Sequence, residues 1–189
     1  MTSCTETTLS DVADLLTGCT FRRPPGPPTG EATVRVLSLG DVSPDGRVLS
    51  DSPARFIEPQ PGLERYSILP GDLLFRGRGG GFAAAVAPAV KEPTAVAAPV
   101  VIIRPHSVEP GFLAWALNRP AAHAFYTVTA RGTALPAIGA KELAMIPIPL
   151  PPLDVQRRIA EIWRLADERS RLEHRLSDLR KVALDHALQ

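Results

Sequence analysis

The amino-acid sequence predicts an α+β fold. We expect a mixed, β-rich domain with short helices over residues 1–152, followed by one long coiled-coil-type helix over residues 153–189. All 20 prolines and all 14 glycines lie before residue 153. This distribution favours short elements separated by turns in the first part and an uninterrupted helix in the second. Short apolar, β-branched runs bounded by turn residues recur through the first part, which is typical of strands.

The first part is predicted to contain both helices and strands. Residues Leu9–Leu16 predict a short helix, because Ser10 can cap it and Val12, Leu15 and Leu16 form an apolar face. Pro110–Leu117 and Ala121–Tyr126 predict two further helices, each with a proline at its start, and Ala140–Ala144 at most one helical turn. The predicted strands are Thr33–Leu39, Leu73–Phe75, Ala83–Val90 and Ala95–Arg104.

Turn and loop signals separate these elements. Asp45-Gly46 is a hairpin turn signal, and Gly77–Gly81 is a glycine-rich loop. Residues 22–30 form a proline-rich loop that opens on two adjacent arginines. Met145–Pro152 is expected to be extended, because its alternating prolines prevent a helix.

The last element is a helix that begins at Asp154, which is a good N-cap. A heptad pattern of about four repeats runs along this helix. Its a positions are Ile162, Arg169, Leu176 and Ala183, and its d positions are Leu165, Leu172, Leu179 and His186. Such a helix cannot bury its apolar stripe alone, so it requires a partner helix, either from another copy or from another protein.

Composition narrows the function classes. The net charge is +1, with 21 basic and 20 acidic side chains, so any nucleic-acid surface must arise from an uneven distribution of charge. Cys4 and Cys19 are not in a CxxC pair, and the four histidines have no ligand spacing, so we expect no metal site, disulfide or cofactor. No apolar run is long enough for a membrane span, and the N-terminus does not resemble a secretory signal. We therefore expect a cytoplasmic protein.

No motif indicates an enzyme. The glycine-rich loop is not followed by Lys-Ser/Thr or by a helix, so it does not match a P-loop or a dinucleotide fingerprint. Asn118-Arg119-Pro120 lacks the second proline and the aromatic residue of an adenine methyltransferase signature, and no nuclease pattern is convincing. We expect no catalytic residues. A glycine-lined loop that carries Arg76 and Arg78 would instead let the backbone approach DNA closely, with arginine contacting guanine or phosphate.

Four stretches together resemble the specificity (S) subunit of type I restriction-modification systems. They are LSDVADLLTGCTF (9–21), VLSLGDVSPDGRVL (36–49), LPGDLLFRGRG (69–79) and GTALPAIGAKELAMIPIPLPPLDVQRRIAEI (132–162). In the last, IPIPLPPLDVQRRI is similar to the segment that joins the family's recognition domain to its long helix. The resemblance implies a half-length form, with one target-recognition domain and one helix.

The resemblance also implies a role and partners. Such subunits read a split double-stranded DNA site through two recognition domains, dock methyltransferase (modification) subunits and have no catalytic residues of their own. For this chain it implies delivery of a methyltransferase, with or without a nuclease, to DNA. Two copies would pair through their helices as a homodimer that reads a symmetric site. The alternative that stays open is an interaction adaptor of this family that no longer binds DNA.

The site candidates follow from these hypotheses. The predicted DNA-binding residues are Arg22, Arg23, Arg76, Gly77, Arg78, Gly79, Arg131, Thr133 and Lys141. The predicted interface residues on the helix are Ile159, Ile162, Leu165, Leu172, Leu176 and Leu179. For each basic residue a solvated surface role is the alternative, and for the helix the alternative is packing against its own domain.

Overall fold

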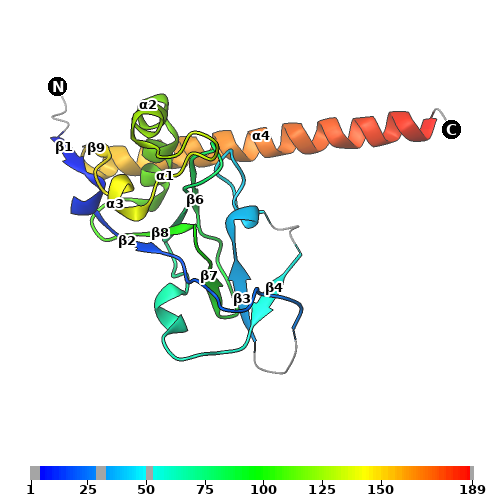
Figure 1. The fold of residues 1–189 in the computed structure, drawn as a ribbon. Helices are drawn as coiled ribbons and strands as arrows, with labels where there is room; N and C mark the ends of the chain where they lie inside the picture. Colours follow the sequence, from blue (N-terminus) through cyan, green and yellow to red (C-terminus); the bar gives the residue numbers. More distant parts are fainter. Residues whose placement is uncertain (1–4, 29–32, 50–52, 188–189) are drawn as a thin grey trace.

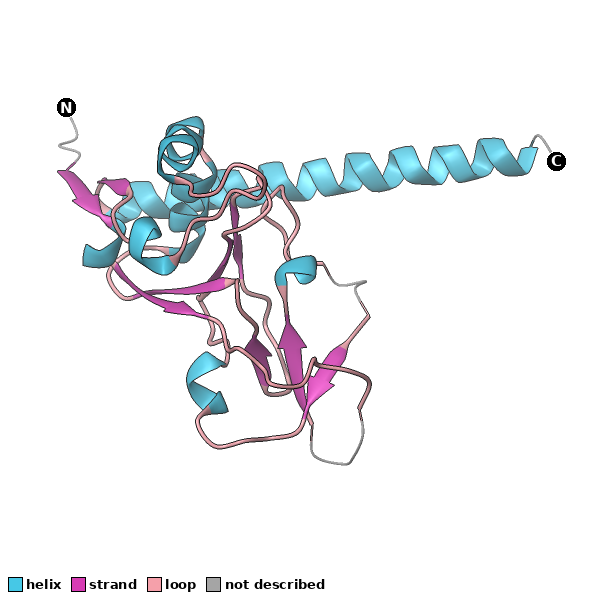
Figure 2. Ribbon diagram, in the orientation of Figure 1, coloured by secondary structure: helices cyan, strands magenta, loops and turns pink. Residues whose placement is uncertain are grey.

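A computed structural model describes residues 5–28, 33–49 and 53–187 of the protein. It contains a mixed α+β domain and a long helix, α4 (Leu153–Ala187), which extends well beyond that domain (Figure 1). The other α-helices gather around the first part of α4, while most of the strands lie on one side of it (Figure 2). The predicted α+β class with a long C-terminal helix is therefore confirmed.

The central sheet has four strands in the order β2-β8-β5-β6. Their bounds are β2 Ala13–Thr17, β5 Leu73–Arg76, β6 Ala83–Val86 and β8 Val101–Pro105. All three pairings are antiparallel. β5 and β8 are buried over most of their length, as their apolar sequences predict, whereas β6 forms an edge of this sheet.

A second sheet lies farther from α4 (Figure 1). Its order is β4-β3-β7, with β3 Val34–Leu37, β4 Arg55–Ile57 and β7 Thr94–Val96. β3 pairs antiparallel with β4 and parallel with β7. Two 3-10 turns border this sheet, η2 (Leu39–Asp41) and η3 (Leu63–Tyr66). In η2 the buried carboxylate of Asp41 accepts hydrogen bonds from the backbone and hydroxyl of Ser38 at 2.7 and 2.8 Å.

Short helices and a two-stranded ribbon complete the domain. The helices are α1 (Pro110–Asn118), α2 (Pro120–Thr129) and α3 (Ala140–Leu143). The ribbon joins β1 (Thr5–Thr8) to β9 (Pro147–Leu150), the strand that immediately precedes α4. The extended segment predicted at Met145–Pro152 thus becomes a strand with a defined partner.

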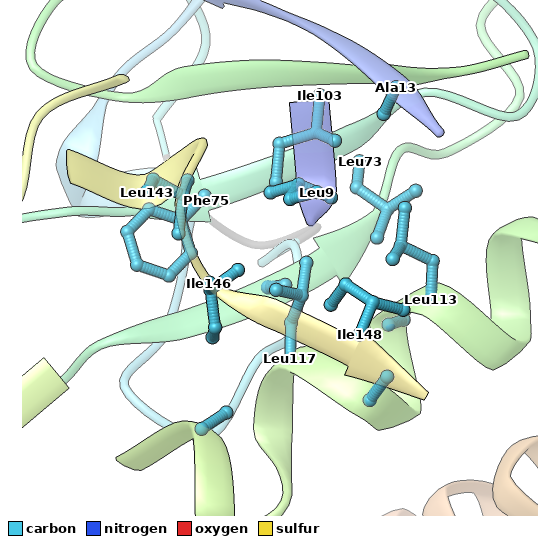
Figure 3. Close-up of a cluster of buried hydrophobic side chains, with 14 of the residues drawn as sticks. Leu9, Ala13, Leu73, Phe75, Ile103, Leu113, Leu117, Leu143, Ile146 and Ile148 are labelled. Atoms are coloured by element: carbon cyan, nitrogen blue, oxygen red, sulfur yellow. The ribbon is translucent and has the colours of Figure 1, made fainter. Parts of the chain in front are cut away.

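The main core lies between the central sheet, α1 and the β1–β9 ribbon (Figure 3). Leu9, Phe75, Leu117 and Ile148 are fully buried in it. Phe75 also contacts the ring of Tyr126 at 5.4 Å between centroids. Burial raises the pKa of the Tyr126 hydroxyl, which donates a hydrogen bond to the carbonyl of Leu117. This core therefore holds the helices that approach α4 against the sheet.

The predicted helix over Leu9–Leu16 is wrong. A 3-10 turn, η1 (Leu9–Asp11), is followed directly by β2. The cap is Thr8 rather than Ser10, and hydrogen bonds from Thr8 and Thr7 lower the pKa of Asp11. A short apolar run fits a helix face or a strand equally well, and here the open edge of β8 decides the outcome, because β2 pairs with it along five residues.

The single strand predicted over Ala95–Arg104 is also wrong. A turn at Ala98-Pro99 divides it into β7 and β8, which belong to different sheets. The backbone N–H of Val100 closes this turn by donating to the carbonyl of Ala97 at 3.2 Å. The strand predicted over Ala83–Val90 ends at Val86, and β1 and β4 were not predicted.

Asn118 satisfies the open edge of β6. Its side-chain oxygen accepts from the backbone N–H of Ala84 at 3.0 Å, and its amide donates to the carbonyls of Ala84 at 2.7 Å and Ala114 at 2.9 Å. We expect Asn118→Ala to lower the free energy of unfolding by about 2–4 kcal/mol, because the buried Ala84 backbone loses both partners. Denaturant unfolding measures this value.

Thr127→Ala is the matched control for this prediction. The Thr127 hydroxyl also donates to a helix carbonyl, that of His123, but at an exposed position. A loss of no more than about 0.5 kcal/mol is therefore expected for the control. Equal losses in the two variants would contradict the role assigned to Asn118.

Candidate nucleic-acid interface

Two loops that are far apart in the sequence lie side by side. Residues 77–81 connect β5 to β6, and residues 131–138 connect α2 to α3. The N–H of Gly79 donates to the carbonyl of Pro136 at 3.1 Å, and the N–H of Ile138 donates to the carbonyl of Gly77 at 2.8 Å. Ala137 is bridged to both Arg78 and Arg131. We call residues 77–81 and 131–138 the loop cluster.

Gly77 and Gly79 of the loop cluster could not carry a side chain without strain. A Cβ atom on Gly77 would lie 2.4 Å from the carbonyl oxygen of Ile138, which is far closer than any real contact. Gly79 adopts a φ of +87°, a conformation that side chains disfavour. The glycines therefore let the two loops run against each other. Their predicted role in an approach to DNA is a separate matter and stays a prediction.

A third loop, the hairpin over residues 42–48, borders the cluster. A Cβ atom on Gly81 would lie 2.7 Å from the Cβ of Pro44. Within this hairpin Asp45 forms a salt bridge with Arg47 and accepts a hydrogen bond from Ser43. Partial burial would raise the pKa of Asp45, but the hydrogen bonds from Ser43 and Arg47 outweigh it and lower that pKa. Arg47 is thus paired within the protein.

Arg76 supports the cluster from inside. Its Nη1 donates to the carbonyls of Leu39 at 2.7 Å and Val42 at 2.9 Å, which ties β5 to the start of the hairpin. Its Nε is buried and has no hydrogen-bond partner among the residues that the structure describes. Arg76 therefore positions the neighbouring loops, and direct contact between Arg76 and DNA stays a prediction.

The exposed face of the cluster carries the remaining predicted residues of this region. Arg78, Arg131 and Thr133 are all exposed, although Arg78 lies more than fifty residues from the other two in the sequence. Arg131 forms a 3.1 Å salt bridge with Glu142, while 81% of its side chain stays accessible. Arg78 has no ion-pair partner within the described parts of the chain. Lys141 is exposed on α3, immediately after the cluster.

Arg22 and Arg23 do not belong to the loop cluster. They are exposed on the segment that precedes Gly26, and Gly26 pairs with Phe56 of β4 through two backbone hydrogen bonds of 3.1 and 2.7 Å. The proline-rich loop thus adds to the edge of the second sheet. Part of the predicted loop, residues 29–30, lies outside the described residues.

A basic hollow on the second sheet was not predicted. It encloses about 380 Å³ and is lined by Arg35, Leu37 and Thr94 of the sheet and by residues 48–49 and 88–92, which include Lys91 and Glu92. Arg35 is half-buried, and its backbone N–H donates to the carbonyl of Pro93 at 3.1 Å. In the sequence, the signal for this hollow was a single arginine inside the apolar strand VRVL. The alternation of side chains along a strand is enough to explain that arginine as a solvent-facing residue.

The predicted interface residues of α4 fall into two groups. Ile159 is half-buried and packs against the main core. Ile162, Leu165, Leu172, Leu176 and Leu179 are each between 48% and 68% exposed. An apolar stripe of this length is therefore uncovered by the domain, and the alternative in which the domain itself covers it does not hold for these five residues.

Two further features bear on function. In the ranges that the structure describes, no group of three or more His, Cys, Asp or Glu residues is arranged to hold a metal ion. The described helices include none whose length and hydropathy suit a bilayer span.

Comparisons with known proteins find solved structures with a similar fold. Neither a scan against family models nor a search of curated proteins finds a match. Among solved structures, an S subunit (HsdS) from Thermoanaerobacter tengcongensis aligns with a TM-score of 0.62 and 24% identity over 92% of this chain and 44% of its own. The S subunit from M. genitalium aligns with 0.61 and 15% identity over 94% of this chain and 42% of its own.

A third structure comes from work on complex assembly and conformational transition of the type I R-M system. It aligns with a TM-score of 0.65 and 22% identity, over 93% of this chain and 41% of its own. At these identities the likeness establishes the fold, and it confirms the resemblance found in the sequence at that level. This chain spans less than half the length of the S subunits that it matches.

Proposed function

We propose that this protein is a sequence-specific DNA-recognition module that directs a type I restriction-modification methyltransferase to its target, with or without a nuclease. The observation that carries the proposal is the fold shared with S subunits over more than nine-tenths of the chain. On this proposal the chain does not catalyse a reaction itself, and the modification subunit supplies the chemistry.

The loop cluster supports this function chemically. Arg78, Arg131 and Thr133 project from loops held together by backbone hydrogen bonds, so they form a preorganised polar edge. Arginine reads guanine and phosphate through two parallel hydrogen bonds. We propose Arg78, Arg131, Thr133 and Lys141 as contacts, with Gly77 and Gly79 shaping the surface and Arg22, Arg23 and Arg76 as further candidates.

The exposed stripe of α4 supports pairing. Leucines at Leu172 and Leu179 occupy successive d positions, and Ile162 and Leu176 occupy a positions. A second copy of the same helix offers the same stripe, so a symmetric pair would bury both. We propose a homodimer through α4 that also docks the modification subunit.

Selection from a random DNA duplex pool tests the function. The protein is mixed with the pool in the presence and in the absence of a type I modification subunit from the same organism, and bound duplexes are sequenced. We expect enrichment of a split, symmetric site. Because the net charge of +1 gives little nonspecific affinity, we expect stronger enrichment when the modification subunit is present.

The result that contradicts the proposal is equally clear. If no sequence is enriched under either condition while the modification subunit still binds, the protein is an interaction adaptor. Methylation of the enriched site must also require the modification subunit, since methyl transfer by this chain alone would overturn its non-catalytic role.

A further inference from the structure

The buried side chains among the described residues of helix α4 lie near its start. Gln156 and Ala160 are buried, with exposed fractions of 3% and 9%, and Ile159 packs against the main core. After Ala160, no described side chain of the helix is buried. The segment from Ala160 to Ala187 spans about 40 Å at about 1.5 Å per residue. The attachment is therefore short compared with the part of the helix that projects from it.

One buried amide links three segments at this attachment. The side-chain oxygen of Gln156 accepts from the backbone N–H of Glu109 at 3.0 Å, and its nitrogen donates to the carbonyl of Pro151 at 2.8 Å. The Glu109 carboxylate in turn caps α1 by accepting from the N–H of Gly111 at 3.1 Å. Gln156 thus fixes the first turn of α4 to the first turn of α1, which sets the rotation of α4 about its own axis.

The next turn of α4 is in close contact with α1. A Cβ atom on Gly111 would lie 2.9 Å from the Cβ of Ala160. The absence of a side chain at Gly111 therefore allows the two helices to approach as closely as they do. Gln156 and Ala160 are four residues apart, so they lie on the same face of α4. Together they determine both the distance and the direction of α4 relative to α1.

A small rotation at this attachment has a large effect at the far end. A tilt of about 10° moves a point about 40 Å away by about 7 Å, which is roughly two base-pair steps of 3.4 Å. In a pair joined through α4, the direction of each helix sets how far apart the two domains lie. The attachment is therefore the place where a change in geometry would alter the spacing between two bound half sites.

We propose that Gln156 and the Gly111–Ala160 contact are the positioning elements that set the direction of α4, and that they thereby set the length of the spacer in the recognised DNA site. The second part rests on the proposed function. None of these three residues needs to contact DNA. Their effect is on spacing, whereas the loop cluster acts on the sequence of each half site.

The first test measures spacer preference. Duplexes carry the half sites found by selection, separated by spacers of randomised length, and the bound fraction is sequenced. We expect the wild type to select one spacer length. Gln156→Met keeps the side-chain volume but removes both hydrogen bonds, so we expect this variant to accept several spacer lengths. The half-site sequence should not change. Arg158→Met is the matched control, because Arg158 is exposed on the same turn and forms a salt bridge with Asp154 on the same helix. This variant should keep one spacer length.

The second test does not depend on DNA. Two spin labels report the distance between the domain and the helix, one at Glu64→Cys on η3 and one at Arg175→Cys on α4. Cys4 and Cys19 are changed to serine in the labelled chain, which is diluted with unlabelled protein. We expect a narrow distribution for the wild type and for Arg158→Met. We expect a broadened distribution for Gln156→Met and a shifted one for Gly111→Ala, which forces the helices apart.

The outcomes separate this inference from the proposed function. Unchanged distance distributions in Gln156→Met would overturn the positioning role, whatever the DNA experiments give. Altered distances with an unchanged single spacer would overturn the link to spacing. If the wild type enriches no DNA at all, the proposed function and the spacer part of the inference both fail, while the distance measurement still decides whether these residues position α4. If Gly111→Ala does not fold, Gln156→Met alone decides.

Discussion

The Leu172→Asp/Leu179→Asp variant is expected to sediment as a monomer at micromolar concentrations at which we expect the wild type to be a dimer. Both leucines are exposed on the free part of α4, at 63% and 59%, and each would place a carboxylate in the apolar seam. Two copies would then bring four such charges into one interface, which apolar burial cannot offset. Analytical ultracentrifugation across a concentration series measures the change.

A control variant with the same added charge separates the effect of a charge in the apolar seam from the effect of a charge elsewhere on the helix. Ser170→Asp/Ser177→Asp adds two carboxylates with the same seven-residue spacing at b positions of the heptad, beside the stripe. The dimer should persist in this variant. A wild type that is already monomeric at micromolar concentration would contradict self-pairing and would leave the stripe to a different protein.

Arg78→Glu is expected to weaken binding to the selected DNA site by about 100-fold. Arg78 is exposed at the centre of the loop cluster, where its backbone is bridged to Ala137. Loss of one arginine contact costs about 1–3 kcal/mol, and the reversed charge adds repulsion from phosphate. Titrations with the selected duplex at fixed salt give the ratio, and a scrambled duplex shows whether specificity is lost as well.

Arg65→Glu provides the matched comparison. It makes the same charge change on η3, where Arg65 lies over the ring of Tyr66 at 5.1 Å from its centroid. We expect an effect below about threefold, because only the long-range charge changes. If the two variants lose affinity equally, the loop cluster is not the recognition surface and net charge alone governs binding.

Local signals in the sequence were sufficient for much of the fold. Proline and glycine placement predicted the long helix, and short apolar runs predicted β3 and β5. The failures have a common physical cause. Leu9–Leu16 and Ala95–Arg104 are apolar runs whose structure depends on partners elsewhere in the chain, β8 for the first and two different sheets for the second. Local propensity contains no information about such partners.

The candidate site shows the same limit more strongly. The sequence placed Arg76, Arg78 and Arg131 together among the predicted DNA-binding residues. Only the fold reveals that Arg76 is bonded to two backbone carbonyls, whereas Arg78 and Arg131 are brought together through Ala137. Likewise, Arg35 is notable only because strand pairing and two distant loops enclose it in a hollow.

The ribbon of β1 and β9 has a consequence for protein engineering. Its register, from Thr5 opposite Leu150 to Thr8 opposite Pro147, places the start of the domain beside the strand that leads into α4. The part of the domain from η1 to α3 therefore begins and ends at neighbouring positions in space. A different domain whose ends pair in the same way could replace this part as a cassette, without any change in the sequence of α4. Exchange of that cassette is expected to change which bases are read. The direction of α4 is expected to be kept only where the new domain also supplies contacts equivalent to those of Glu109 with Gln156 and of Gly111 with Ala160.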